Sequence, residues 1–133
     1  MSEYQAAHRR AACAAITALG NRIGLYYGTT RVGTAYSDTT WATPTDISEP
    51  VNPALPADPG SNPTVAKAQS VGSDVTIAVP ANTVPNGTVI DRYGIHNGTT
   101  LLRTEKLSVA MVINDGSQAF QAQVTPRFKY RGE

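Results

Sequence analysis

The sequence predicts a mainly β protein: an N-terminal Ala-rich helix packed on an antiparallel β-sandwich or barrel-like core of about six or seven strands, with a long Pro-rich arm. Three observations lead to this prediction. Alanines fill residues 2–19, apolar and polar residues alternate through most of the later sequence, and six of the nine prolines lie between residues 44 and 63. The length of 133 residues fits a single domain, 1–133.

The first predicted element is a helix over residues 2–19. Alanine is the best helix former, and Ser2 and Gln5 stand at the spacing of a capping box. Gly20 and Asn21 then offer a left-handed residue to close the helix. Small side chains on one face predict close packing against a sheet or a neighbouring subunit. That face consists of residues three or four apart: Tyr4, Ala7, Ala11, Ala15 and Leu19.

Residues 22–42 are expected to form strands. RIGLYYG (22–28) has apolar residues at a period of two, which is typical of a half-buried strand. TTRVGT (29–34) is expected to be a connection. AYSDTTWAT (35–43) is rich in threonine and aromatic residues, as strands are.

Residues 43–64 are interpreted as a Pro-rich arm. Proline cannot donate to a strand ladder, so we expect this segment to lie outside the sheets, extended and semi-rigid. It holds almost no large apolar side chains, and we therefore expect it to be mobile alone and ordered against a partner. With the small helix face, the arm supplies the candidate partner-binding residues: Pro50, Pro53, Leu55, Pro56, Pro59, Ala7, Ala11 and Ala15.

Residues 73–130 are expected to form the β core. SDVTIAVP (73–80) alternates three apolar residues, and in SQAFQAQVTPRFKY (117–130) Phe120, Ala122 and Val124 share one face. The turn Asn114-Asp115-Gly116 leads into this last segment.

Between these segments lies the clearest hairpin of the sequence. The runs 87–97 and 99–114 flank Asn97-Gly98. Both of these residues tolerate the positive φ angles of a type I′ turn, so we expect that turn here.

The sequence offers no catalytic constellation. His96 stands just before the hairpin turn, where we expect it to face solvent, and strict alternation places Asp91 on the opposite strand face. Cys13 lies among helical alanines, and His8, five residues earlier, falls on another helix face. GxSxG, HExxH and glycine-rich phosphate loops are absent from the sequence. We therefore predict a protein that is not an enzyme.

The composition argues against several classes of ligand and partner. One cysteine allows neither an internal disulfide nor a cysteine metal cluster, so we expect no metal and no cofactor. A formal net charge of +1 without a concentrated basic face argues against nucleic acid. No run reaches the roughly 18 to 20 apolar residues of a membrane span, and no signal peptide is recognisable. Synthesis in the cytoplasm is expected.

Aromatic residues keep a second function open. On a β-sandwich they could form one exposed platform that stacks on sugar rings, as in a host-glycan-binding module. The competing interpretation is that they close the edges of the core. The residues concerned are Tyr26, Tyr27, Tyr36, Trp41 and Tyr93.

The order of the segments resembles a known group of proteins. After the Ala-rich helix, which ends in LG, come IGLYYGTT (23–30), AYSDTTW (35–41), VPANTVPNGT (79–88) and IDRYGIHNGTTLLR (90–103). Over residues 6–42 and 74 to about 128, this pattern resembles small virion proteins of tailed phages that infect actinobacteria, described as minor tail or tail-fibre-like proteins.

The resemblance implies a non-enzymatic structural protein, made in the host bacterial cytoplasm and located in the virion. Its partners would be other virion proteins, namely major capsid or tail proteins, and we expect a homo-oligomer, with a trimer as the first expectation. The Pro-rich arm stands where the resembling proteins have a shorter glycine-rich connection. Such an arm suits capsid decoration and tail attachment equally, and both locations stay open.

Overall fold

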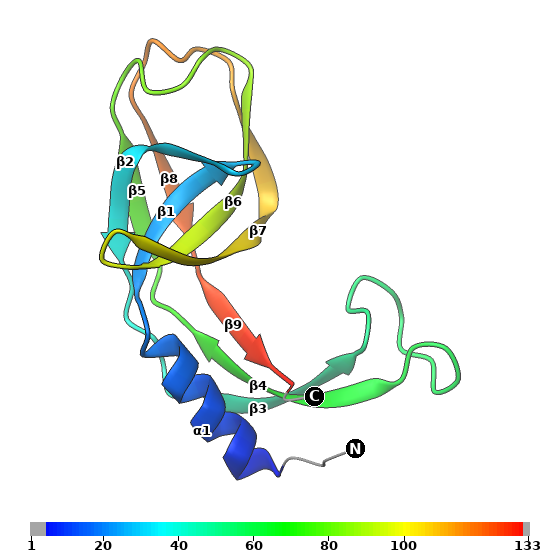
Figure 1. The fold of residues 1–133 in the computed structure, drawn as a ribbon. Coiled ribbons are helices and arrows are strands. Elements are labelled where there is room, and N and C mark those ends of the chain that lie inside the picture. The colour runs from blue at the N-terminus through cyan, green and yellow to red at the C-terminus, as the bar shows by residue number, and fades with distance from the viewer. Residues whose placement is uncertain (1–4, 132–133) are drawn as a thin grey trace. The chain divides into compact units, whose positions relative to one another are not determined.

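The structure is a computed structural model that describes residues 5–131 (Figure 1). Strands account for 56% of the described residues, in which a single short helix precedes them, so the predicted mainly β class with antiparallel sheets is confirmed. The described residues form nine strands instead of about six or seven. These strands belong to three sheets, and the fold is not a closed barrel.

The chain divides into two compact units, each described by itself. The helix unit takes its described residues from 1–18, 41–71 and 127–133, and the β unit comprises 19–40 and 72–126. Each unit is therefore assembled from separate stretches of the sequence. The single domain expected from the chain length stays a prediction.

In the helix unit, one helix covers a three-stranded antiparallel sheet of order β3-β4-β9. Cys13 and Thr17 are the buried helix residues, while Ala7, Ala11 and Ala15 are exposed. The expectation that this alanine face packs on the protein's own sheet is therefore wrong. The elements are α1 (Ala6–Thr17), β3 (Thr45–Pro50), β4 (Thr64–Val71) and β9 (Arg127–Tyr130).

Both predicted helix ends need correction. The helix begins at Ala6 with Gln5 as an N-cap that makes no side-chain capping bond, and Ser2 lies outside the described residues. The C-cap is Ala18 in the right-handed region, with φ −68°. Gly20 is not left-handed but serves close approach, because a Cβ there would lie 2.3 Å from the carbonyl oxygen of His96.

The β unit contains a four-stranded sheet of order β2-β1-β6-β7 and a two-stranded sheet, β5-β8. The alternating residues of β5 and β8 are buried as predicted, and they join the apolar side chains of β1 and β6 in the core of this unit. The strands are β1 (Arg22–Tyr27), β2 (Thr30–Asp38), β5 (Val75–Val79), β6 (Thr88–Asn97), β7 (Thr100–Ile113) and β8 (Phe120–Val124).

The predicted β6–β7 hairpin is present, but its turn differs. Asn97 pairs with Thr100, so the two turn residues are Gly98 and Thr99, and Gly98 has φ +61° while Asn97 is not in the positive region. A glycine at the first central position is typical of a type II′ turn rather than type I′. Gly28 has the same place, with φ +63°, between β1 and β2. The expected connection 29–34 is therefore largely strand.

A β-bulge in β7, opposite the middle of β6, accompanies a change of the buried face along β6, contrary to the strict alternation predicted. The register with β7 shifts between Ile90 and Arg92. Between the pairs Ile90–Met111 and Arg92–Lys106 there is one residue in β6 and four in β7, so the extra residues belong to β7 and disrupt the ladder there. The alternation of buried and exposed residues along β6 breaks at the same point. Ile90, Tyr93 and Ile95 are consequently all buried in the core.

Candidate functional site

The strongest candidate site is the tip of the β3–β4 hairpin. Thr45–Pro50 pairs in antiparallel register with Thr64–Gln69, so the prediction that residues 43–64 avoid every sheet is wrong for residues 45–50. The physical reason is position: β3 is an edge strand that ends at Pro50, where a missing donor is tolerated. The thirteen residues 51–63 that join the two strands are called the Asn62 loop.

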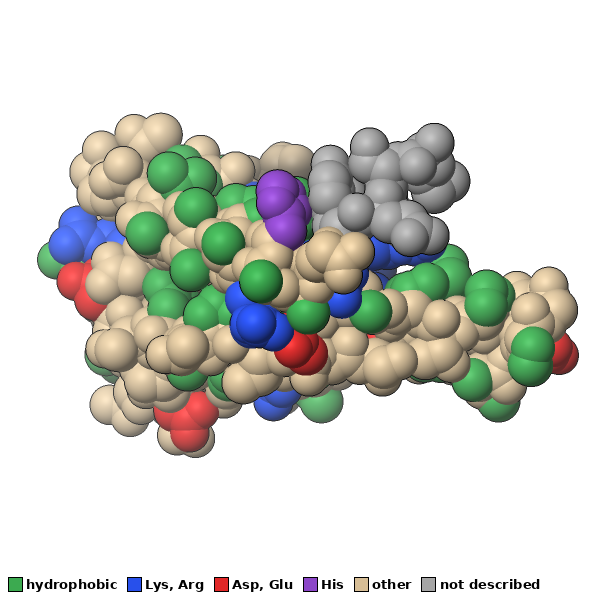
Figure 2. Space-filling view, turned by 90° about the horizontal axis from the view of Figure 1, so that it is seen from below, with side chains coloured by type: hydrophobic (Ala, Val, Ile, Leu, Met, Phe, Trp, Pro, Cys, Tyr) green, Lys and Arg blue, Asp and Glu red, His purple; other side chains and the backbone are tan. Residues whose placement is uncertain are grey.

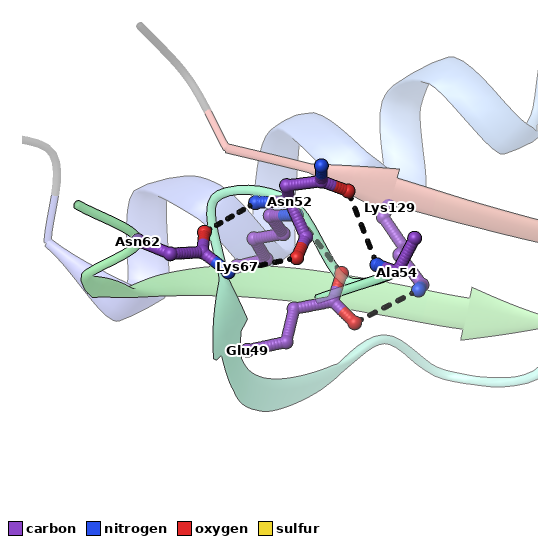
Figure 3. Close-up of polar contacts among 6 residues, drawn as sticks. All are labelled: Glu49, Asn52, Ala54, Asn62, Lys67 and Lys129. Carbon is purple, nitrogen blue, oxygen red and sulfur yellow. Dashed lines mark hydrogen bonds and ion pairs between the residues drawn. The ribbon is translucent and has the colours of Figure 1, made fainter. Parts of the chain in front are cut away.

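Asn62 holds the Asn62 loop from inside (Figure 3). Its side chain is 6% exposed, and its Oδ1 accepts the backbone N–H of Asn52 at 2.8 Å. Its Nδ2 donates to three carbonyl oxygens, those of Asn52 at 3.0 Å, Pro56 at 3.0 Å and Leu55 at 3.3 Å. One side-chain amide thus ties down backbone groups six to ten residues away.

Further bonds stiffen the Asn62 loop. The backbones of Asp58 and Asn62 exchange two hydrogen bonds, of 2.8 Å and 2.7 Å. The side chains of Asn52 and Asp58 each accept an N–H two residues on, from Ala54 at 3.1 Å and Gly60 at 2.9 Å. The backbone N–H groups of Gly60 and Ser61 lower the pKa of the Asp58 carboxyl. These are Asx turns, which fix a chain locally.

The ordered loop presents apolar side chains to solvent. Every residue from 51 to 61 is exposed, including Val51 at 46% and Leu55 at 56%. Hydrophobic side chains stand out along this projecting end of the helix unit (Figure 2). The predicted site residues Pro53, Leu55, Pro56 and Pro59 therefore lie together on one exposed loop, while Pro50 is half-buried at the end of β3. The loop is held by internal hydrogen bonds, which favour an ordered loop over the mobile arm expected from the sequence.

An ion-pair cluster lies next to the Asn62 loop, where the loop joins the strands (Figure 3). Glu49 on β3 accepts from Lys67 on β4 at 2.9 Å and from Lys129 on β9 at 3.0 Å. The hydrogen bond from Lys67, supported by that from Lys129, lowers the pKa of the Glu49 carboxyl. Because the Glu49 and Lys67 side chains are largely shielded, this cluster links all three strands more firmly than an exposed pair would.

The other predicted site residues lie on the helix. Ala7, Ala11 and Ala15 form an exposed face of small side chains in the same unit. Cys13, weighed above as a nucleophile, is fully buried beneath this face.

His96 is buried, and the expectation that it faces solvent is wrong. Its Nδ1 lies 3.0 Å from the Arg22 carbonyl oxygen, which only accepts, so Nδ1 carries the proton and Nε2 accepts from the Tyr26 hydroxyl at 2.8 Å. The two rings stack with centroids 5.9 Å apart. Burial, reinforced by the charge of Arg31, lowers the pKa of the imidazole.

Glycines make room for this pair of rings. Gly24 and Gly94 are partners in the β1–β6 ladder. A Cβ on Gly94 would lie 2.4 Å from the Tyr26 ring, and one on Gly24 would lie 3.1 Å from the His96 ring. Gly94 is thus a packing residue in the middle of β6.

The aromatic residues do not form the platform that a glycan site would need. Tyr26 and Tyr93 are each 5% exposed. Tyr36 is 49% exposed, but the Arg22 guanidinium lies over one face of its ring, 3.8 Å from the centroid. Trp41 is half-buried in the helix unit, where it lines an open pocket of about 360 Å³.

The described part of the chain offers neither a metal cluster nor a membrane-spanning helix. Residues 5–131 hold no group of three or more His, Cys, Asp or Glu that could bind a metal ion. Over the same range, no helix has both the length and the apolar character that spanning a membrane requires.

Comparison with known proteins gives no relative. None of the family models, curated proteins or solved structures matches the chain.

Proposed function

We propose that the chain is a non-enzymatic structural protein of a tailed-phage virion, attached to the capsid surface or the tail through the Asn62 loop. One observation supports this above the others: a loop of thirteen residues is ordered by its own buried asparagine, yet all of residues 51–61 are left exposed. The resemblance of the surrounding strands to phage virion proteins gives the setting.

Preorganisation is what makes the loop suitable for attachment. A flexible segment loses conformational freedom on binding, which weakens affinity, whereas a loop already fixed by hydrogen bonds and prolines loses little. Val51 and Leu55 supply apolar contact area, and the prolines add rigid surface beside them. The partners in this proposal are major capsid or tail proteins.

Many weak contacts would act together. Virion accessory proteins occupy repeated positions, so a homo-oligomer multiplies a modest affinity per loop. The exposed Ala7, Ala11 and Ala15 face allows close approach of a second protein surface beside the loop contact.

The test uses a matched pair of exposed leucines. Leu55 in the loop is 56% exposed and Leu19 outside it is 57% exposed, so aspartate at either position has the same exposure and charge. We expect Leu55→Asp to fold normally but to lower incorporation into particles at least tenfold, measured by gel densitometry and electron microscopy of purified virions. Leu19→Asp should be incorporated like the unchanged protein.

The same assay examines the helix face. Ala11→Glu keeps a good helix former at an exposed position, so any loss of incorporation reports a lost contact. Full occupancy of particles by Leu55→Asp would contradict attachment through the Asn62 loop. Absence of the unchanged protein from particles would contradict the virion function as a whole.

A further inference from the structure

β7 forms an open edge of the β unit. It is the last strand of the four-stranded sheet, and no strand in the described residues pairs with its outer edge. None of its fourteen residues is buried. The β6–β7 hairpin also carries five of the nine large apolar side chains that are exposed in the described chain: Val89, Leu101, Leu102, Val109 and Val112.

Such an edge calls for a partner. Unpaired backbone N–H and C=O groups beside apolar side chains form a template for another strand, and proteins usually blunt such edges with proline and several charges. β7 contains no proline, and its three charged residues, Arg103, Glu105 and Lys106, all lie in one short stretch. Its two register irregularities lie on either side of Arg103–Lys106, so that stretch keeps regular strand pairing.

The sequence of this edge is complementary to itself. In an antiparallel pair of two β7 strands centred on Thr104, Arg103 of each copy lies opposite Glu105 of the other. Thr104 then faces Thr104. Opposite charges and Thr–Thr pairs each favour cross-strand pairing, whereas a register centred on Lys106 would set like charges opposite each other.

The charges are placed to act across this edge. Arg103 and Glu105 lie in register with Ile95 and Tyr93, whose side chains are buried, so both charged side chains sit on the core side of the sheet. They are 21% and 43% exposed, and their charged atoms are 3.5 Å apart. A second copy would place another carboxylate and another guanidinium beside them and complete an alternating group of four charges. Partial shielding makes such contacts stronger than those of fully exposed pairs.

We propose that the outer edge of β7 pairs antiparallel with β7 of a second copy across a two-fold axis through Thr104. A two-fold axis builds a dimer, in contrast to the trimer expected from the sequence. This inference rests on the proposed function for its role in the virion. Its test uses only purified protein, so its failure is distinguishable from a failure of attachment to particles.

Charge reversal tests the register. In sedimentation of the purified full chain over a range of concentrations, the unchanged protein should run as a dimer. Arg103→Glu and Glu105→Arg each set like charges opposite each other and should raise the dissociation constant at least tenfold. The double variant restores both pairs and should return it to within about threefold of the original. Lys106→Glu serves as the control. It changes the net charge by the same amount, but position 106 lies opposite Leu102 and not opposite a charged residue.

A cross-link tests the same axis independently of stability. Directly opposite residues of antiparallel strands have Cα atoms about 4.5 to 5.5 Å apart, within the range that a disulfide spans. Thr104→Cys should therefore give a covalent dimer on mild oxidation, and Lys106→Cys should not. A monomer or a trimer in sedimentation, a double variant as weak as the single ones, or no cross-link at position 104 would overturn the proposal.

Discussion

Two hairpins in this protein are closed by opposite means. The β6–β7 hairpin closes with two residues, Gly98 and Thr99, and the positive φ of Gly98 sets the geometry. The β3–β4 hairpin closes with the thirteen-residue Asn62 loop, whose shape depends on one buried amide. The short turn is determined by backbone chemistry and the long loop by a single side chain. The second arrangement leaves the loop surface free for contacts.

The largest expected effect lies within the short hairpin. Gly94→Ala on β6 places a Cβ 2.4 Å from the Tyr26 ring and 2.9 Å from Leu101, so the stacked pair must shift. Overpacking of this kind destabilises by about 3 kcal/mol. Urea unfolding measures it. A decrease of less than about 1 kcal/mol in the free energy of unfolding would show that β6 tolerates a side chain at position 94.

The next effect isolates the long loop. Asn62→Ala leaves the N–H of Asn52 and the carbonyls of Leu55 and Pro56 without their side-chain partner. We expect about 2 kcal/mol of destabilisation from the lost bonds. Limited proteolysis should cut this variant inside residues 51–61 before any strand, whereas we expect the loop of the unchanged protein to resist. An equally resistant variant would mean that Asn62 does not organise the loop.

A pair of glycines sharpens the contrast. Gly98→Ala forces a side chain into the left-handed region and should destabilise by about 1 kcal/mol. Gly60→Ala, within the Asn62 loop, meets only an ordinary contact with the Asp58 carboxylate at 3.6 Å, and its φ is not positive. Thermal melts should show almost no change for the loop glycine. Equal effects at both positions would remove the distinction between the two hairpins.

The smallest effect depends on pH. The pKa of His96 is lowered in the folded state, so below about pH 6.5 the unfolded chain binds a proton that the folded chain does not. The free energy of unfolding should therefore fall as pH drops from 7.5 to 5.5. Glu49 has a lowered carboxyl pKa and loses its contribution only at more acidic pH. The control is His96→Gln, which should be less stable at pH 7.5 and should lose the His96 part of this slope. An unchanged slope in that variant would contradict the assignment.

Part of the fold could be predicted because some sequence patterns are compatible with only one local structure. Alternation placed β5 and β8 with their buried faces, and a glycine-containing dipeptide placed the β6–β7 hairpin. The predicted turn type was wrong because Gly98 can form a two-residue turn with either of its neighbours, Asn97 or Thr99. The prediction of which β6 residues share a face was wrong because a β-bulge cannot be recognised in the pattern of apolar residues.

The candidate site was only half predictable. Proline content located the exposed segment, but it concealed β3, whose prolines lie at or outside its ends. Asn62 could not be identified, because its partners lie six to ten residues away and asparagine is common in ordinary loops. The buried helix face was missed because alanines surround the helix on every side, and Cys13 and Thr17 differ little from them in hydrophobicity.

Hydrogen exchange of the isolated protein tests the central claim most directly. The backbone N–H groups of Asn52, Asp58 and Asn62 are all bonded within the Asn62 loop. If the loop is ordered before any partner binds, these amides should exchange at least a hundredfold more slowly than in an unstructured peptide, and Asn62→Ala should abolish that protection. Exchange of all three at the unstructured rate in the unchanged protein would contradict a preorganised loop.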